Sequence, residues 1–308
     1  MKNMTTLGKV SARVDELSRN CTDHLVPVKD ISFDSIESIR IVNEVHPMRP
    51  IAQQSISARL GIPIQYLKKC PSEVQAYNLN HWIKQEKNEK LFLRFDSEEV
   101  RAVFTPKYQP IDNFEVLQRL DDLGYPPETP VQCHLDPEFM SISLLEGKQT
   151  FSIDGSKITP GVAISNSEIG LACLSIAAFF LRLICTNGLV ATTEVRAAYK
   201  HVSLKIFKEF PSVLEKVSLE LAKKRDQFRI STQSKVDNPL VTLESFNRQF
   251  QLSKDQRDAV EWGWSKEGGD TMFSIVNAYT RASQFDGLSA ESSYRLQKVG
   301  GTILEMVQ

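Results

Sequence analysis

The change from helical to alternating periodicity at Leu91 limits the fold of this chain more than any other feature. LFLRF and VRAVFT flank an acidic turn, DSEE, and the runs VQCHL, FMSISLLE, QTFSID and GVAIS follow. Apolar side chains with a period of two predict strands, and Asp154-Gly155 predicts a tight turn before the last run. Only one helix interrupts the series, so we expect the strands to pair antiparallel, as in an α+β fold rather than a βαβ repeat.

Helical patterns surround these strands. Asp112 or Asn113 can cap the intervening helix FEVLQRLDDLG, and Gly124 ends it. The most apolar segment, residues 170–185, predicts a buried central helix that Asn187-Gly188 closes with a left-handed turn. Helical spacing also predicts further helices at residues 55–60, 63–69, 72–87, 195–207, 211–228, 240–262, 270–281 and 289–306.

The expected fold class is therefore α+β, an antiparallel β-sheet with a β-hairpin packed on a central apolar helix. We divide the chain into a mainly helical N-terminal region (1–90), an α+β core domain (91–235) and a helical C-terminal region (236–308). Within the first region, IAQQSISARLGIPIQYLKKCP resembles a small helix-turn-helix, although its apolar spacing equally fits any packed pair of helices.

Charge is balanced over the chain and uneven along it. The 308 residues carry 37 basic and 38 acidic side chains, which excludes attraction to nucleic acid through overall positive charge. Residues 111–170 nevertheless sum to about −7, and residues 193–235 to about +5. We expect a polarised molecule, in which an acidic face of one subunit can meet the basic face of the next.

A basic stripe marks the second of these regions. Arg196, Lys200, His201, Lys205 and Lys208 have the spacing of one helical face, with two aromatic residues close by. Such a stripe can follow a phosphate backbone and offer rings to bases. The alternative is the solvated face of an ordinary amphipathic helix.

Signatures of catalysis and cofactor binding are missing from the sequence. Neither a phosphate-binding loop nor HExxH is present, and the five cysteines form no CxxC pair. His134 and Asp136 share a strand face, which suits a surface hydrogen bond better than a metal or acid–base pair. We therefore expect no cofactor and no metal, and the sequence favours a non-enzymatic role over an enzyme without deciding between them.

Targeting signals are also missing. The N-terminus has no signal-peptide pattern, and the most apolar stretch is shorter than the roughly 20 residues of a membrane span. The odd number of cysteines argues against a disulfide framework. We expect a reduced, cytoplasmic protein without a membrane partner.

Several motifs carry a resemblance to a known family. Residues 161–190, GVAISNSEIGLACLSIAAFFLRLICTNGLV, contain an N-S-E-x-G motif and an R-x-x-C-T-N-G motif. Arg101-Ala-Val-Phe-Thr, the Tyr108-x-Pro-x-Asp-Asn turn and Asn277-Ala-Tyr-Thr add to them in order. Over residues 90–285 the chain resembles a family of phage- and plasmid-related proteins with a domain of unknown function.

A more distant similarity is to the single-strand annealing proteins of the RecT, Erf and radiation-sensitive-fifty-two group. Those proteins pack a β-hairpin sheet on a long helix that often ends near a Phe-Gly-Asn turn, which this chain lacks. The similarity implies binding of single-stranded DNA and annealing by rings or filaments, although a shared fold does not by itself carry function.

The motif residues also have physical roles. Asn166 and Ser167 can cap the central helix, Glu168 suits its N-terminus, and Gly170 allows a close backbone approach. Arg182 should either pair, for example with an acid from the sheet, or face a groove. We treat Cys185, at the end of the helix, and Gly188 as structural, whereas the Asn187 amide can also meet a phosphate.

Our leading hypothesis is a mobile-element protein of DNA metabolism and recombination that binds single-stranded DNA as a homo-oligomer, with strand annealing as the possible extension. The alternatives are an interaction protein that modulates a host factor through its acidic region, and an enzyme acting on nucleic acid. The candidate DNA contacts are Arg94, Arg101, Lys107, Tyr108, Arg182, Asn187, Arg196, Lys200, His201, Lys205 and Lys208.

Overall fold

The chain folds into two compact units, each described here by itself. The computed structural model describes residues 2–145, 147, 150–153, 155–182, 187–191, 197–199, 212 and 224–307. The large unit comprises Met1–Ala12, Ile111–Ser167 and Ala172–Gln308, and the small unit comprises Arg13–Pro110 and Glu168–Leu171. These limits differ from the predicted boundaries after residues 90 and 235. The reason is that the first strand of the chain and its last helix both pack with strands from the middle of the sequence in the large unit.

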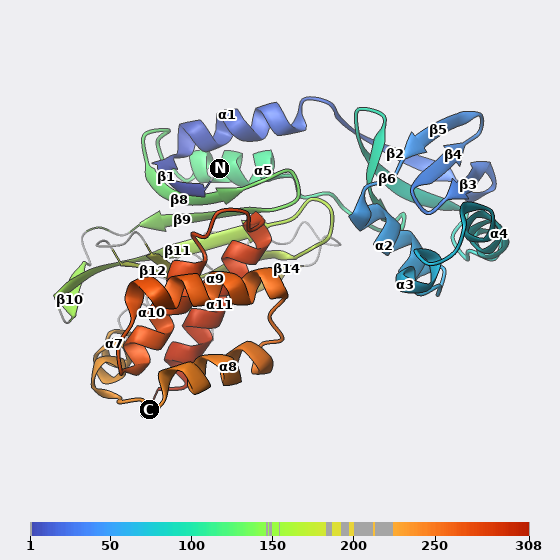
Figure 1. Ribbon diagram of the computed structural model, residues 1–308. Coiled ribbons are helices and arrows are strands. Elements are labelled where there is room, and N and C mark those ends of the chain that lie inside the picture. Colours follow the sequence, from blue (N-terminus) through green and yellow to red (C-terminus); the bar gives the residue numbers. More distant parts are fainter. Residues whose placement is uncertain are drawn as a thin grey trace. The chain divides into compact units, whose positions relative to one another are not determined.

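An antiparallel sheet forms the centre of the large unit (Figure 1). Its strand order is β1-β8-β9-β11-β12-β13, with β10 paired to β11 and β14 paired to β12. The strands are β1 (Lys2–Thr6), β8 (Pro130–Leu135), β9 (Met140–Leu145), β10 (Phe151–Ile153), β11 (Ser156–Asn166), β12 (Leu174–Arg182), β13 (Asn187–Ala191) and β14 (Ala197–Tyr199). The predicted α+β class with an antiparallel sheet is confirmed.

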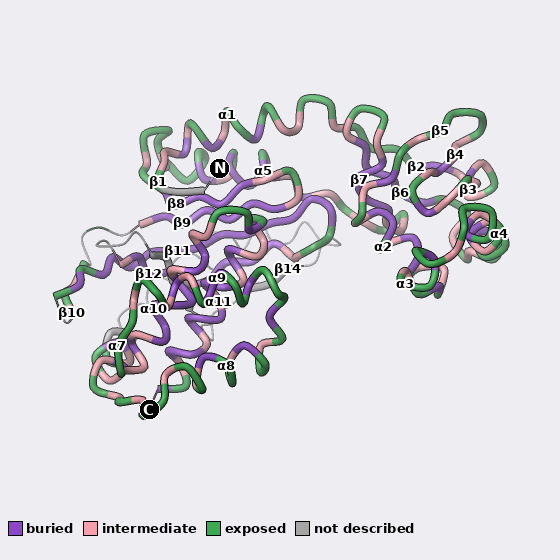
Figure 2. Tube along the Cα trace, in the orientation of Figure 1, coloured by how far each residue is buried: buried purple, intermediate pink, exposed green. Residues whose placement is uncertain are grey.

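The predicted central helix is wrong, because strand β12 occupies Leu174–Arg182. Both faces of this strand are buried, as are those of β8 and β9 (Figure 2). A strand covered on both faces reads as a continuous apolar run, which periodicity cannot distinguish from a buried helix. The predicted left-handed turn is wrong as well, since Asn187 and Gly188 begin β13 opposite Arg182 and Leu181.

Helices cover the sheet of the large unit. They are α5 (Asn113–Asp122), α7 (Lys224–Gln233), α8 (Pro239–Gln249), α9 (Lys254–Glu267), α10 (Met272–Ala282) and α11 (Ala290–Glu305), and α1 (Leu7–Ser18) begins in this unit. Helix α11 lies against β13, β8 and β9, and α10 packs on α9 and α11. Among the described residues, no helix combines the length and apolar character that crossing a membrane requires.

Helix boundaries follow local capping signals. The Glu115 carboxylate accepts a hydrogen bond of 2.9 Å from the Asp112 backbone N–H, and Gly124 has a φ of 85° just past the end of α5. Both ends of this helix are therefore as predicted. The single helix predicted over 240–262 is instead α8 and α9, because Ser253 and Gln256 form a capping box that starts a second helix.

The small unit combines two three-stranded sheets with short helices. One sheet has the order β2-β6-β7 and the other the order β3-β4-β5. The elements are β2 (Cys21–Pro27), the 3-10 helix η1 (Val28–Asp30), β3 (Ile31–Ser35), β4 (Ser38–Ile41), β5 (Glu44–Pro47), α2 (Pro50–Arg59), α3 (Ile64–Leu67), α4 (Ser72–Ile83), β6 (Lys90–Asp96) and β7 (Glu99–Phe104). The hairpin predicted from Leu91 onward is present as β6 and β7.

Residues 1–90 contain the helices α1 to α4 and, in addition, five strands, β1 to β5, that the sequence pattern did not predict. Apolar residues of β3, β4, α2, α4 and β6, among them Phe33, Ile39, Ile56, Leu79 and Leu93, form one core in the small unit. Helix α3 has a single turn between Pro63 and Lys68, which is too short for the recognition helix of a helix-turn-helix.

Close helix packing in the large unit leads to a first prediction. A Cβ atom at Gly263 of α9 would overlap the carbonyl oxygen of Ala278 in α10. We expect Gly263→Ala to lower the free energy of unfolding by about 1–3 kcal/mol, because the helices must move apart. Urea denaturation followed by circular dichroism measures the change.

Glu261→Ala, at an exposed position of the same helix, is the matched control for Gly263→Ala. We expect it to change the free energy of unfolding by less than about 0.5 kcal/mol. Equal stability of the Gly263→Ala variant and the parent would contradict the close contact between α9 and α10.

Candidate functional site

Four of the predicted motif residues meet in a polar network inside the small unit. Arg101 Nη1 lies 2.9 Å from Glu168 Oε2, and Arg94 Nη1 donates a 3.0 Å hydrogen bond to the Glu168 carbonyl oxygen. The Tyr108 hydroxyl donates to the same carbonyl oxygen at 3.0 Å, and Arg94 Nε lies 2.8 Å from Asp23 Oδ1. The β6–β7 hairpin thus binds the loop Glu168–Leu171 through charge-assisted hydrogen bonds.

Burial changes the role of the two hairpin arginines. Arg94 is 2% exposed and Arg101 is 4% exposed. A buried, paired guanidinium has no free face for a phosphate, so the structure contradicts the prediction that these side chains contact DNA. The prediction failed because the groups that cover these arginines, Asp23 and the loop with Glu168, are distant from the hairpin in sequence.

The neighbouring turn has one exposed cation. Lys107 is exposed, whereas Tyr108 is half-buried and stacks on Phe104 with a centroid distance of 3.7 Å. Gly170 has a φ of 85°, and a Cβ there would press on the Phe104 ring, which explains the glycine.

The predicted capping role of the N-S-E-x-G motif is wrong. Residues 168–170 form a turn that leads into strand β12, so they do not lie at the N-terminus of a helix.

The first half of the motif acts within the large unit. Asn166 donates from Nδ2 to the Ile111 carbonyl oxygen at 2.9 Å and to Asn113 Oδ1 at 3.0 Å. The Ser167 hydroxyl donates to the Glu138 carbonyl oxygen at 2.8 Å. Both residues are buried, so they stabilise the end of β11 and offer no surface for a ligand.

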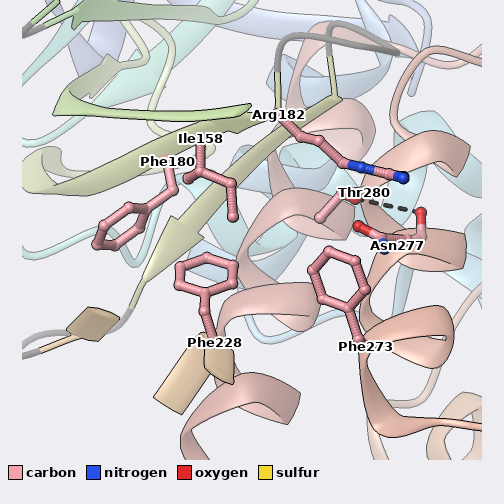
Figure 3. A pocket seen from close by; sticks show the side chains of 7 residues that line it. All are labelled: Ile158, Phe180, Arg182, Phe228, Phe273, Asn277 and Thr280. Carbon is pink, nitrogen blue, oxygen red and sulfur yellow. Dashed lines mark hydrogen bonds between the residues drawn. The ribbon is translucent and has the colours of Figure 1, made fainter. Parts of the chain in front are cut away.

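Arg182 joins a second group of motif residues around a small cavity (Figure 3). Its Nη1 lies 2.6 Å from Glu267 Oε2, its Nε donates to Ser156 Oγ at 3.0 Å, and its guanidinium lies 5.4 Å from the Phe273 centroid. The acid comes from α9 rather than from the sheet. Pairing of this kind occupies Arg182 and argues against direct contact with DNA.

The cavity beside Arg182 also receives Asn277 and Thr280 of α10, and three phenylalanines line it. Its volume of about 10 Å³ suits roughly one water molecule. Tyr279, from the same motif, places its hydroxyl 2.8 Å from Asn247 Oδ1 and 3.1 Å from the Leu243 carbonyl oxygen. These residues hold α10 against its neighbours, which is a structural role.

The remaining predicted contacts divide into two sets. Asn187 and Gly188 lie in β13, where their backbone pairs with β12. The basic stripe and the structural cysteine of the motif lie outside the described residues, namely Cys185, Arg196, Lys200, His201, Lys205 and Lys208.

Catalytic groups do not converge in the described part of the chain. His134 Nε2 lies 3.0 Å from Gln297 Nε2, and Asp136 accepts hydrogen bonds from backbone N–H groups, Ala290 among them. No three His, Cys, Asp or Glu side chains among the described residues form a metal-ligand group. Burial raises the pKa of the Cys133 thiol to about 12, so it is not a thiolate at neutral pH.

An exposed aromatic face on α4 was not anticipated. Tyr77 is 74% exposed and stacks with His81, with a centroid distance of 6.4 Å and an interplanar angle of 14°. Trp82 is 43% exposed and meets His81 edge-on at 5.1 Å. We call Val74, Tyr77, His81 and Trp82 the α4 face.

Positive charge accompanies the α4 face. The lysines before, after and at the end of the helix are all exposed, namely Lys68, Lys69, Lys84, Lys87 and Lys90. The sequence predicts a helix over 72–87 without separating its exposed face from its buried one. The spacing of residues along the helix indicates which side is exposed. Gln75, Leu79 and Ile83 recur every four residues and form the buried face, so the rings of Tyr77 and Trp82 lie off that face.

Comparison of the chain with protein-family models, with curated proteins and with solved structures gives no match.

The Arg101–Glu168 pair leads to a second prediction. We expect Glu168→Gln to lower the free energy of unfolding by about 3–5 kcal/mol, because the Arg101 charge stays buried without its counter-ion. Thermal and urea denaturation measure the loss.

Glu244→Gln is the control for an ion pair, because the Glu244–Arg248 pair is exposed on α8. We expect it to change the free energy of unfolding by at most about 0.5 kcal/mol. A loss of the same size in both variants would mean that the Glu168 carboxylate is not buried against Arg101.

Proposed function

We propose that the protein binds single-stranded DNA and that the α4 face supplies the stacking platform for bases. The single observation that carries this proposal is the pair of stacked, exposed rings of Tyr77 and His81 beside Trp82. Contiguous exposed rings, unlike single apolar side chains scattered over a surface, mark a site for a ligand or partner. Base stacking uses such rings without regard to base identity.

The lysines around α4 supply the positive charge that binding of single-stranded DNA requires in addition to stacking rings. Lys68, Lys69 and Lys84 are exposed near the ring-bearing helix, where they can neutralise phosphates while the bases stack. The segment from residue 68 to 90 holds three acids. Glu86 lies 3.7 Å from Arg59 with a side chain only 8% exposed, and Glu73 and Glu89 are exposed, so the five lysines outnumber the glutamates. Local charge therefore favours a polyanion even though the whole chain is nearly neutral.

The biological setting and the annealing activity remain proposals that rest on the family resemblance. In this proposal a phage- or plasmid-borne homo-oligomer holds a strand on each subunit and presents its bases to a complementary strand. The antiparallel sheet of the large unit is a feature shared with the annealing proteins, but strand β12 occupies the segment compared with their long helix, so the sheet alone supports the comparison.

The proposed binding of single-stranded DNA gives a third prediction. We expect Trp82→Ala and Tyr77→Ala each to weaken binding of a fluorescein-labelled oligothymidine by about 1–3 kcal/mol, or roughly 5- to 150-fold, because a base loses its stacking partner. Tyr77→Phe keeps the ring and should bind as the parent does. Fluorescence anisotropy at several salt concentrations measures the affinities, and Lys84→Gln should reduce the salt dependence.

Phe114→Ala is the matched control, because Phe114 is an aromatic residue of α5 that is 52% exposed. It should not change binding. If the parent fails to bind at low salt, strand binding is wrong. If it binds and the α4 variants bind equally well, the α4 face is not the site, and deletion of charge in the acidic stretch 111–170 would then test the host-factor alternative.

A further inference from the structure

A groove on the small unit has the opposite electrostatic character from the α4 face. It has a volume of about 380 Å³ and lies along β2, next to the β4–β5 and β6–β7 turns. Phe95 lies in its wall between two histidines, with centroid distances of 5.4 Å to His24 and 5.3 Å to His46. This volume is in the range of about 300–1,000 Å³ found for ligand sites.

Strand β2 gives the groove an open backbone edge. It lies at the end of the sheet order β2-β6-β7, and among the described residues it pairs only with β6. Four consecutive residues of β2, from Thr22 to Leu25, are exposed, and the Leu25 side chain is apolar and 53% exposed. An edge strand of this kind presents unpaired N–H and C=O groups to a further strand.

The charge of the groove selects the partner. Asp30, Glu44 and Glu98 line it, and its lining includes no lysine or arginine. Within the described residues, the carboxylates of Asp30 and Glu98 make no ion pair, and Glu44 reaches only His46 at 3.8 Å. Acidic walls beside apolar Leu25 and Val42 complement a segment that carries both basic and aliphatic side chains.

Two residues that line the groove have strained backbone conformations with a positive φ. Val42 has a φ of 56° and Ser97 a φ of 54°, and both residues line it. A β-branched residue such as valine rarely adopts a positive φ. Strained turns of this kind are held by their surroundings and are common beside binding sites.

We propose that this groove binds an extended segment of a protein partner, with alternating basic and aliphatic residues, that adds as a strand to β2. The partner's main chain pairs with the open edge of β2, as in other strand-addition complexes. Its basic side chains meet Asp30 and Glu98, and its aliphatic side chains pack on Leu25 and Val42. Nucleic acid does not fit this site, because the groove's carboxylates repel phosphates.

The test uses the full-length protein and three short fluorescein-labelled peptides. The first alternates lysine and valine, the second has glutamate for each lysine, and the third is the first with N-methylated alternate backbone nitrogens. Fluorescence anisotropy should show saturable binding of the first peptide only. Saturable binding of the N-methylated peptide with equal affinity would overturn strand addition, and absence of binding by the first peptide would overturn the proposal as a whole.

Variants locate the peptide on the protein. We expect the double variant Asp30→Asn, Glu98→Gln to weaken binding of the lysine–valine peptide by roughly tenfold or more. Glu37→Gln, an exposed carboxylate of the small unit outside the groove, should bind as the parent does. Equal binding by the double variant and the parent would overturn the site.

Peptide binding in the groove is independent of the proposed binding of single-stranded DNA by the α4 face. Trp82→Ala should retain full affinity for the lysine–valine peptide, and the double variant should retain full affinity for oligothymidine. Loss of peptide binding in Trp82→Ala would place the peptide on the α4 face and overturn the groove as its site.

Discussion

The buried pairing of Arg94 and Arg101 with Glu168 and Asp23 determines what the small unit can present at its surface. Two buried guanidinium groups without partners would be costly, because each would lose its hydration without compensation. The Glu168 carboxylate neutralises one of them, and the Glu168 carbonyl oxygen accepts from the other. The loop that carries Glu168 must therefore stay on the hairpin, because both buried guanidinium groups depend on it for hydrogen bonds.

This arrangement gives the order of the motifs along the chain a structural meaning. Arg101, Tyr108, Glu168 and Gly170 belong to one network, although up to 69 positions separate them along the chain. Asn166 and Ser167 bind main-chain groups of the large unit directly before the loop leaves its sheet. The motif thus secures the path of the chain, and surfaces for ligands have to be sought elsewhere.

The sequence predicted local features better than buried ones. The hairpin β6–β7 and both ends of α5 followed from turn and capping residues that act over a few positions. Strand β12 did not, because a run such as LSIAAFFL fits a buried helix and a doubly covered strand equally well. The burial of Arg94 was also beyond prediction, since its partners Asp23 and Glu168 are distant in sequence. The α4 face, in contrast, was readable from helical spacing alone.

The two surfaces of opposite charge on the small unit favour different classes of ligand, as the two proposals require. Lysines around the α4 face attract phosphates, and they repel a cationic peptide by the same field. Carboxylates at the β2 groove act in the reverse sense. Because a Debye length of about 8 Å limits these fields at physiological salt, each surface acts on ligands that are already close. The proposed DNA strand and the proposed basic segment can then occupy one unit without competing, because each is attracted to the surface of opposite charge and repelled by the other.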